Sequence, residues 1–283
     1  MKLPLSVIIL TYNEELNIEN CLKNIVNWAE EIFIVDSYSA DKTLKIAKKY
    51  EAKIIQHSFE NQAQQFNWAL DNLEIKNDWI LRLDADEYLT EELKNEIIGK
   101  LKNTADDISG FYIKRRVYFM GRWIRHGGYY PIWLLRLFRK NKAKSELRAM
   151  DEHIVLLNGK GEKLKNDFID DNKKDLTWWI EKHNNYASRE AGEVMNYESG
   201  IMNYGGKIEG QVARKRWLKE KFYYRLPIFF RAFFYFIYRY IIRFGFLDGA
   251  KGLIFHFLQG FWYRFLVDSK IYEAEKRQLY SGD

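Results

Sequence analysis

Short apolar runs alternate with helically periodic segments over the first hundred residues. The apolar runs predict buried strands at residues 5–10, 31–35, 53–56 and 79–83. The predicted helices have their apolar positions at Ile18, Leu22, Ile25 and Ala29, at residues 43–50, at Ala63, Phe66, Leu70 and Leu73, and at Leu93, Ile97 and Leu101. Strands that alternate with helices indicate right-handed βαβ units, and therefore an α/β fold with a mainly parallel sheet and helices on both faces.

The pattern changes after residue 110. Residues 111–119 and 133–139 predict longer strands, with a loop rich in glycine and aromatic residues between them. Residues 140–205 are polar, apart from a predicted helix near residues 178–194. This second stretch therefore carries a different arrangement of strands and helices from the first.

The C-terminal part of the chain is a basic aromatic region in which aromatic residues cluster between Trp217 and Phe265. The arginines interleaved with them are Arg225, Arg231, Arg239, Arg243 and Arg264. Arg239 and Arg243 lie four residues apart and are predicted to share one helix face. Aromatic side chains buried at the headgroup boundary, with arginines beside them for lipid phosphates, favour helices that lie on a membrane surface.

Two other interpretations of the basic aromatic region stay open. One is a helical hairpin that packs on the rest of the chain or on a second subunit, and the other is nucleic-acid binding through stacked aromatics and arginines. No recognition motif supports nucleic acid, so none is expected as a partner. A membrane-spanning helix needs about 20 mostly apolar residues. None is expected here, because the longest charge-free piece, residues 252–263, contains a histidine, a glutamine and a glycine.

Composition excludes several classes of protein. Hydrophobic residues make up 47% of the 283 and charged residues 30%, which excludes a disordered chain. The single cysteine, Cys21, excludes a disulfide framework and a cysteine-rich metal site, and we expect it to be a small buried hydrophobe. The apolar start at residues 3–10 lacks the small-residue cleavage site of a signal peptide, and its β-branched residues fit a buried strand better.

Polar side chains follow three of the predicted strands at their carboxyl ends. Asn13 and Glu14 follow the first strand, Asp36 follows the second, and Asp84 and Asp86 follow the fourth. Ligands of open parallel sheets bind beyond the carboxyl ends of the strands. The candidate site is therefore expected at this edge of the sheet.

The sharpest of these motifs is Asp84-Ala85-Asp86. Two carboxylates at period two on a strand end point to the same side. Hard oxygen ligands at that spacing suit Mg²⁺ or Mn²⁺ shared with a diphosphate. The alternative is a solvated acidic turn in which Asp86 caps the next helix.

The other two strand ends offer groups for a nucleoside. Asp36 can accept hydrogen bonds from a base or a ribose, or it belongs to a plain turn in which Ser39 or Asp41 caps a helix. Tyr12 can stack on a base and Glu14 can accept a hydrogen bond from it, with a helix cap as the alternative.

Together, the three strand ends resemble family-2 inverting glycosyltransferases, which have the GT-A fold. The resemblance covers residues 4–90. The nucleotide-sugar site that it implies consists of Thr11, Tyr12, Asn13, Glu14, Asp36, Gln62, Gln65, Asp84 and Ala85. Asp84 and Asp86 would hold the divalent metal, Mg²⁺ or Mn²⁺, and Asp36 would contact the nucleoside.

One branch of that family, the lipopolysaccharide-core β-glucosyltransferases, is similar to this chain over residues 35–43. Looser matches lie at residues 136–139 and 245–249. The chain departs from many members at Leu10, where they have proline.

The third predicted helix also departs from the family. It offers Gln62 and Gln65 where many members place an arginine or lysine near the diphosphate. Glutamines donate hydrogen bonds but add no positive charge. Neutralising a diphosphate would then rely on the metal or on a later arginine, and the candidates are Arg115, Arg136 and Arg139.

Sugar transfer also requires a base that takes the proton of the acceptor hydroxyl. An acidic pair, Asp151 and Glu152, is the candidate that the resemblance implies, with Glu152 favoured and surface carboxylates as the alternative. The candidate acceptor residues are Trp123, His126 and Arg136. Core packing is the alternative for Trp123. The second acidic stretch, residues 167–171, is predicted to be a solvated loop.

The resemblance implies an enzyme, a hexosyltransferase that moves glucose from UDP-glucose to a lipid-linked saccharide such as the lipopolysaccharide inner core. Residues 1–105 would bind the nucleotide sugar, residues 106–205 the acceptor, and residues 206–283 a membrane surface. The expected location is cytoplasmic, peripheral on the inner face of the cytoplasmic membrane, and a homo-oligomer is left open. A polyprenyl-phosphate acceptor and a non-catalytic glycolipid- or nucleotide-binding protein are the alternatives.

Overall fold

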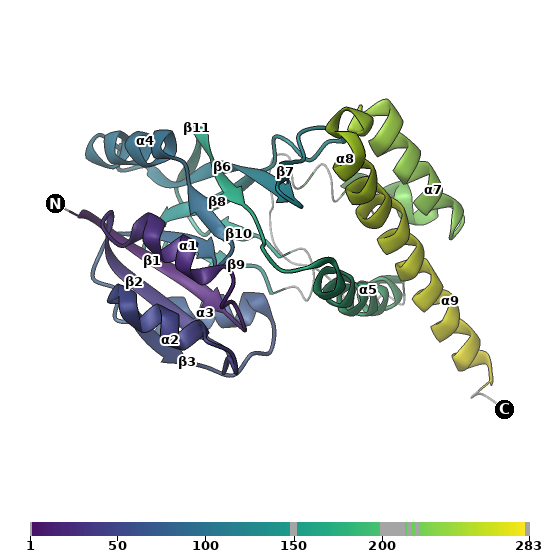
Figure 1. The fold of residues 1–283 in the computed structure, drawn as a ribbon, viewed down its shortest axis with the longest axis horizontal. Coiled ribbons are helices and arrows are strands. Elements are labelled where there is room, and N and C mark those ends of the chain that lie inside the picture. The colour runs from purple at the N-terminus through teal and green to yellow at the C-terminus, as the bar shows by residue number, and fades with distance from the viewer. Residues whose placement is uncertain (1, 148–151, 199–212, 214–216, 219–220, 281–283) are drawn as a thin grey trace. The chain divides into compact units, whose positions relative to one another are not determined.

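The computed structural model describes residues 2–147, 152–198, 213, 217–218 and 221–280. The chain forms two compact units (Figure 1). The first unit contains residues 1–121 and 131–173, and the second contains residues 122–130 and 174–283. The functional division at residues 105 and 205 stays a prediction.

The first unit is built on a mixed sheet whose strands lie in the order β3-β2-β1-β4-β8-β6-β11-β5. The strands are β1 (Leu3–Thr11), β2 (Ala29–Asp36), β3 (Lys53–Gln56), β4 (Trp79–Asp84), β5 (Glu87–Leu89), β6 (Ile108–Phe119), β8 (Trp133–Arg139) and β11 (Lys160–Asp170). Strands β3, β2, β1 and β4 are parallel, and β8 runs antiparallel to β4 and β6. A separate antiparallel pair joins β9 (Ala143–Ser145) to β10 (Ile154–Leu156).

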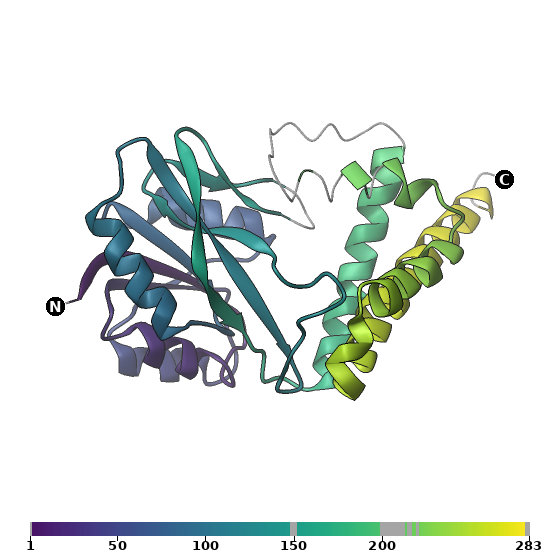
Figure 2. The same cartoon turned by 90° about the horizontal axis from the view of Figure 1, so that it is seen from above.

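Helices cover both faces of this sheet, as the alternating pattern predicted (Figures 1 and 2). They are α1 (Ile18–Ile25), α2 (Thr43–Ala47), η1 (Lys48–Tyr50), α3 (Gln62–Asn72) and α4 (Glu91–Lys102). Helices α1 and α4 pack on one face, while α3 packs on the other. Asn61 begins α3 by accepting a hydrogen bond from the Gln64 amide, and Thr90 begins α4 in the same way.

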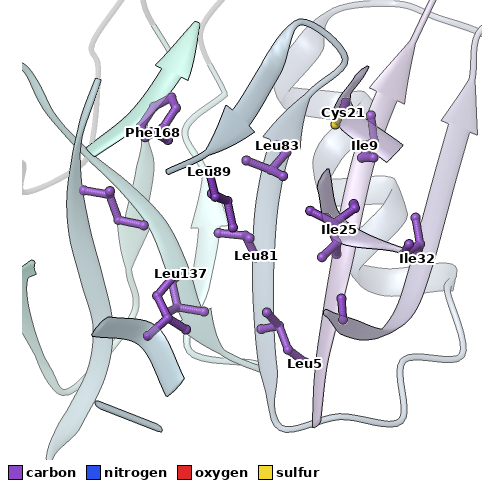
Figure 3. Packing of buried hydrophobic residues seen from close by; sticks show 14 of the residues in the cluster. Leu5, Ile9, Cys21, Ile25, Ile32, Leu81, Leu83, Leu89, Leu137 and Phe168 are labelled. Atoms are coloured by element: carbon purple, nitrogen blue, oxygen red, sulfur yellow. The ribbon is translucent and has the colours of Figure 1, made fainter. Parts of the chain in front are cut away.

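Strand alternation decides which side chains enter which half of the core. In β1, Leu5 and Ile9 face the α1 side, whereas Ile8 faces the α3 side. Figure 3 shows Leu81 of β4 among the side chains of the α1 side. Cys21 lies in this cluster and is buried, as expected. Burying one leucine or isoleucine side chain of this core stabilises the fold by about 1.5–3 kcal/mol.

The prediction of a solvated loop at residues 167–171 is wrong for most of its length, because β11 continues to Asp170. Asp167 is 2% exposed and pairs with Lys114 Nζ at 3.1 Å and with Arg116 Nε at 2.5 Å. Both cations come from the neighbouring strand β6. Charged residues that satisfy each other across strands hide the hydrophobic alternation by which a strand is found in a sequence.

The second unit is mostly helical. Its elements are β7 (Arg122–Trp123), α5 (Leu176–Glu198), η2 (Tyr223–Arg225), α7 (Phe230–Ile237), η3 (Tyr238–Ile242), η4 (Gly245–Asp248), α8 (Gly249–His256), η5 (Phe257–Trp262) and α9 (Tyr263–Tyr280). Helix α5 packs along α9 around Ala187, Ala191 and Val267 (Figure 1). In the part of the chain that is described, no helix is both long and apolar enough to cross a bilayer.

Arg239 and Arg243 both lie against residues 127–128, which agrees with the prediction that they share a helix face. Residues 238–242 form a π-helical turn, in which each turn holds slightly more than four residues, so a spacing of four still returns to nearly the same side. Arg239 is buried, donates to the Gly127 carbonyl over 2.8 Å and lies on the Tyr129 ring. Arg243 is exposed.

Candidate functional site

The carboxyl ends of three neighbouring parallel strands meet at one edge of the first unit. Thr11 of β1 pairs in register with Asp36 of β2, and Leu10 pairs with Asp84 of β4. The polar residues that the sequence placed after separate strands are therefore neighbours in space. This edge is where ligands of such sheets bind.

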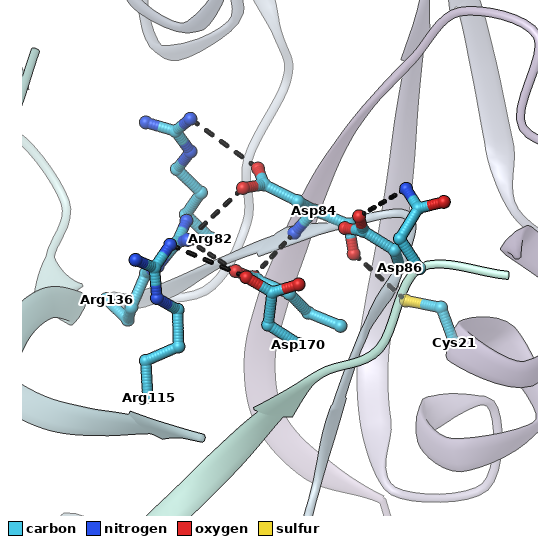
Figure 4. Close-up of polar contacts among 9 residues, drawn as sticks. Cys21, Arg82, Asp84, Asp86, Arg115, Arg136 and Asp170 are labelled. Atoms are coloured by element: carbon cyan, nitrogen blue, oxygen red, sulfur yellow. Dashed lines mark hydrogen bonds and ion pairs between the residues drawn. The ribbon is translucent and has the colours of Figure 1, made fainter. Parts of the chain in front are cut away.

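Asp84 is the last residue of β4 and the centre of an ionic cluster (Figure 4). Its Oδ1 lies 3.5 Å from Arg82 Nη2, and its Oδ2 lies 3.2 Å from Arg136 Nη2. The same Arg136 nitrogen donates to Glu87 Oε1 over 2.6 Å, and Glu87 Oε2 accepts from the Asp84 amide over 2.9 Å. Two buried arginines and a buried glutamate thus hold one half-exposed carboxylate in place.

Asp86 lies in the turn between β4 and β5, so it does not continue the strand as the period-two argument assumed. Its Oδ2 accepts from Asn172 Nδ2 over 2.8 Å, and its carbonyl accepts from the Asp171 amide over 3.0 Å. It does not cap the next helix, because Thr90 does. Asn172 after β11 is a neighbour of the motif that sequence reasoning missed.

In the acidic cluster around Asp84, buried and neighbouring carboxylates repel one another. Burial raises the pKa of the Glu87 carboxyl well above its usual range, opposed by Arg136 and reinforced by the carboxylates of Asp84, Asp170 and Asp86. Although burial alone lowers the pKa of the Arg136 guanidinium, Glu87 and Asp84 outweigh it and raise that pKa. A divalent cation at this place would relieve the mutual repulsion of the carboxylates.

The donor set fits Mg²⁺ or Mn²⁺, because Asp84 and Asp86 offer hard carboxylate oxygens and are half-exposed. Among the residues that the structure describes, no three His, Cys, Asp or Glu side chains are grouped to hold a metal by themselves. An ion here would therefore take its remaining ligands from water or from a bound diphosphate.

Asp36 is completely buried, and its carboxylate organises the loops at the sheet edge. It accepts from Thr11 Oγ1 over 3.0 Å, from the Ser39 amide over 2.9 Å and from Gln56 Nε2 over 3.3 Å. In this arrangement, a direct contact with a nucleoside would require Asp36 to exchange one of these partners.

The loops after β1 and β2 are bonded to each other. Asn13 donates from its amide to Ser39 Oγ over 2.8 Å and accepts at Oδ1 from the Ala40 amide over 2.8 Å. The Glu14 amide donates to Thr43 Oγ1 over 2.7 Å. These contacts leave the Tyr12 ring 60% exposed at the edge, where a flat ligand can reach it.

The start of α3 joins two parts of the candidate site. With its amide oriented so that both polar atoms find partners, Gln62 donates to Glu152 Oε1 over 3.0 Å and accepts from Arg82 Nη2 over 2.7 Å. Gln65 is buried and binds His57 and Ser37 instead. The structure thus links Glu152 through Gln62 and Arg82 to Asp84.

Arg82 is the functional candidate that sequence reasoning missed. It is 5% exposed, and its guanidinium lies 5.0 Å from the centre of the Phe66 ring of α3. Arg82 and Asp84 are two residues apart on β4 and so project from the same face. The available signal was an arginine inside an otherwise apolar strand, two positions before a carboxylate.

The three arginines proposed for a diphosphate lie in different places. Arg136 is in the ionic cluster, and Arg115 Nη1 lies 3.5 Å from Asp170 Oδ2 near it (Figure 4). Arg139 is at the opposite edge, since it pairs with Trp79 at the start of β4 and binds Asp78 at 2.7 Å. Arg139 is therefore excluded as a diphosphate ligand. Ala85, the middle residue of the Asp84-Ala85-Asp86 motif, is buried.

The remaining predicted residues fall outside this cluster. Asp151 lies outside the described residues. Trp123 and His126 belong to the second unit. There Trp123 packs edge-on against Tyr130 with ring centres 5.0 Å apart, and His126 Nδ1 lies 2.7 Å from Asp248 Oδ1. Their roles toward an acceptor stay predictions.

Comparison with known sequences gives a consistent picture. Residues 6–158 match the family described as Glycosyl transferase family 2. The chain is 32% identical over 165 residues to the lipopolysaccharide core biosynthesis glycosyltransferase LpsC of Rhizobium meliloti, covering 54% of this chain and 58% of LpsC. It is 41% identical over 93 residues to an uncharacterized glycosyltransferase of Rickettsia bellii, covering 33% of this chain but only 31% of that protein.

A solved structure resembles the whole chain. The mannosyltransferase PcManGT of Pyrobaculum calidifontis, solved in complex with GDP-Man and Mn²⁺, aligns with a TM-score of 0.51 at 13% identity. The alignment covers 100% of this chain and 89% of that one. At this identity the similarity concerns the fold alone.

Proposed function

The chain belongs to glycosyltransferase family 2, and we propose that it transfers a hexose from a nucleotide sugar to a lipid-linked saccharide. The ionic cluster around Asp84 supports this proposal most strongly, because it brings a half-exposed carboxylate next to two arginines at the edge where parallel sheets bind their ligands. The name of LpsC supports an acceptor in the lipopolysaccharide core and, with the branch resemblance, UDP-glucose as the donor.

The proposed donor site uses residues of the first unit. Tyr12 and the loop around Asn13 and Glu14 would take the base, with Asp36 holding the adjoining loops in place. Asp84 and Asp86 would hold Mg²⁺ or Mn²⁺, and such an ion supplies Lewis-acid stabilisation of the departing diphosphate.

Arg82 would supply the positive charge that the helix α3 lacks. Its guanidinium lies on the Phe66 ring of α3 and 3.5 Å from an oxygen of Asp84, so it would meet a diphosphate that binds beside Asp84. Arg136 would assist by holding Asp84 and Glu87 in fixed positions. Both cations are buried, where their attraction for an anion is less screened than in water.

Transfer would proceed by one direct displacement that inverts the anomeric carbon. The acceptor oxygen forms the new bond to that carbon while the bond to the diphosphate oxygen breaks. Glu152 would take the hydroxyl proton, and the Gln62 amide would orient the carboxylate that receives it. Asp151 is the alternative base, and Trp123 and His126 are proposed for the acceptor.

The second unit is proposed to bring the enzyme to the cytoplasmic face of the inner membrane as a peripheral protein. Its described helices expose many large apolar side chains, including Phe230, Phe233 and Phe257. A lipid-linked acceptor would be presented at that surface.

Product analysis tests the proposal directly. The full chain is incubated with Mn²⁺, extracted glycolipid and a panel of UDP- and GDP-sugars, and the products are analysed for the sugar and its anomeric configuration. We expect glucose from UDP-glucose with inversion. Binding of UDP without transfer or slow hydrolysis of any nucleotide sugar would instead identify a non-catalytic binding protein.

A further inference from the structure

We infer that residues 241–247 form a bilayer-insertion turn and that Arg122 and Arg243 beside it bind lipid phosphates of an anionic membrane. This inference deepens the proposed function, since it rests on the proposal that the enzyme works at a membrane, and it names the element that makes the contact. All residues concerned belong to the second unit.

The turn displays an unusual density of exposed apolar side chains. They are Ile241 (52% exposed), Ile242 (60%), Phe244 (57%), Phe246 (45%) and Leu247 (53%). Five of seven consecutive positions are therefore large and apolar, and each is at least 45% exposed. Soluble monomers rarely leave such a contiguous group in water, so the turn indicates an apolar environment.

Hydrogen bonds and close packing hold the backbone of the turn in place. Phe244 adopts a left-handed backbone (φ +59°), which is uncommon for an aromatic residue and needs support from its surroundings. Its amide donates to the Ile241 carbonyl over 3.1 Å, and its carbonyl accepts from the Leu247 amide over 3.0 Å. Gly245 is required at the centre, because a Cβ there would lie 2.7 Å from atoms of the buried His256 ring.

A loop distant in sequence fixes the base of the turn. The Gly127 amide donates to the Arg243 carbonyl over 2.9 Å, while the Gly127 carbonyl accepts from Arg239 Nε over 2.8 Å. His126 is held from its amide and its ring by the buried carboxylate of Asp248, at 3.0 and 2.7 Å. The turn is therefore held at both of its ends, through Arg243 and through Asp248.

Cationic side chains lie immediately beside the apolar turn. The Arg122 Nη2 atom lies 3.5 Å from the Leu247 carbonyl, and Arg122 is exposed. Arg243 is also exposed, with its guanidinium next to Gly128. Between residues 221 and 267 the sequence has a single acidic residue, Asp248, which is buried and paired with His126.

The combination of basic and apolar side chains indicates which partner the turn binds. An anionic bilayer offers phosphates at the depth of the arginines and hydrocarbon just below them. A second copy of the chain would have to cover the same basic rim with another basic rim, since the turn would face itself. The bilayer is therefore the partner that the turn fits.

The test is flotation of the full-length protein with vesicles of neutral lipid alone or with anionic phospholipid added. The key variant is Leu247→Asp and the matched control is Leu157→Asp, because the two leucines are 53% and 51% exposed and only the first lies in the turn. We expect Leu247→Asp to lower partitioning at least about tenfold, since it removes one buried apolar side chain. Leu157→Asp should float like the wild type.

A second variant tests the arginines. Arg243→Gln should weaken binding to anionic vesicles about fivefold and leave the weaker binding to neutral vesicles unchanged. As an independent readout, Leu247→Cys is labelled with an environment-sensitive dye, which reacts at this position because the only other cysteine, Cys21, is buried. The fluorescence emission of the dye should shift to the blue when vesicles are added.

Three results would overturn the inference. They are wild-type flotation by Leu247→Asp, an unshifted dye spectrum in the presence of bound vesicles, and a wild-type dimer that Leu247→Asp converts to a monomer without affecting flotation. UDP binding is measured on the same samples. Failure of the wild type to bind vesicles while it still binds UDP counts against the insertion turn alone, and normal flotation of the wild type without UDP binding counts against the proposed function alone.

Discussion

At the scale of single residues, Asp84 shows how the candidate metal site is held together. Its two oxygens face Arg82 and Arg136, and its own amide is held by Glu87. With Asp86 and Asp170 nearby, negative charge is concentrated at a place where burial already disfavours it. The motif and Arg136 were identified from the sequence, whereas Arg82 was missed because it lies inside an apolar run that predicted a buried strand.

Arg82 gives the sharpest residue-scale prediction. Arg82→Gln should weaken UDP binding about tenfold or more, since a charge-assisted hydrogen bond contributes about 1.5–3 kcal/mol. Uridine, which lacks the diphosphate, should bind as before and serves as the check on folding. Calorimetric titration with both ligands measures the difference.

The matched control is Arg139→Gln, because Arg139 is also a partly buried arginine of the sheet but lies at the opposite edge. We expect it to leave UDP affinity unchanged. Equal UDP affinity in Arg82→Gln and wild type would remove Arg82 from the donor site.

Glu152 gives the second residue-scale prediction. Glu152→Gln should preserve UDP binding and lower the rate of sugar transfer by about 10²–10⁴-fold, the usual contribution of a general base. Initial rates with saturating donor measure it, and Glu162→Gln, a surface change at β11, is the control. Transfer that survives in Glu152→Gln and disappears in Asp151→Asn would assign the base to Asp151.

At the scale of elements, the apolar pattern was sufficient to predict a strand or helix wherever one face of that element packs against the core. Strands β1 to β4 and helices α1, α3 and α4 follow the predicted order, because their buried positions recur with the period of the element. Strand β11 was missed because lysines and arginines of β6 pair with its acids. Asp86 was misplaced because nothing in the sequence marks where β4 gives way to a turn.

The second unit shows the same limit in its helices. A spacing of four predicted one face for Arg239 and Arg243, but it predicted neither the π-helical turn at residues 238–242 nor the burial of Arg239. Such a turn depends on packing, here of Arg239 against Gly127 and Tyr129, which are distant in the sequence. Local periodicity does not contain that information.

Two buried histidines of the second unit predict how its stability depends on pH. Burial lowers the pKa of His183 to about 4, and burial together with Arg239 lowers the pKa of His256 to about 4. Both are then neutral in the folded protein, while the unfolded chain takes up protons below its ordinary pKa of about 6.5. The stability they contribute is therefore complete above pH 6.5 and is lost as the pH falls toward 4.

Thermal unfolding of the full chain between pH 7.5 and 4.5 measures this effect, which approaches about 3 kcal/mol per histidine at the acid limit. His183→Gln should make the dependence shallower, because that side chain takes no proton. A melting temperature that is level across this range in the wild type would contradict the account.

At the scale of the whole molecule, the sequence predicted the GT-A fold class and the family, and both are confirmed. They were accessible because several strand-end motifs occur in a fixed order along the chain. The compact units were not, since residues 122–130 are grouped with the C-terminal helices although strands of the first unit flank them in sequence. That exchange rests on contacts such as His126 with Asp248, which no local pattern reveals.

The central claim is that Asp84 and Asp86 hold a cation that binds the donor diphosphate. Calorimetric titration of UDP into the full chain, with Mn²⁺ and then with a chelator, tests it most directly when the wild type is compared with Asp86→Asn. Asp78→Asn is the control, because Asp78 is an exposed aspartate beside the other end of β4. We predict that UDP binds only with metal and that Asp86→Asn abolishes this binding while Asp78→Asn retains it. UDP binding that is equally tight with the chelator, or unchanged in Asp86→Asn, would contradict the claim.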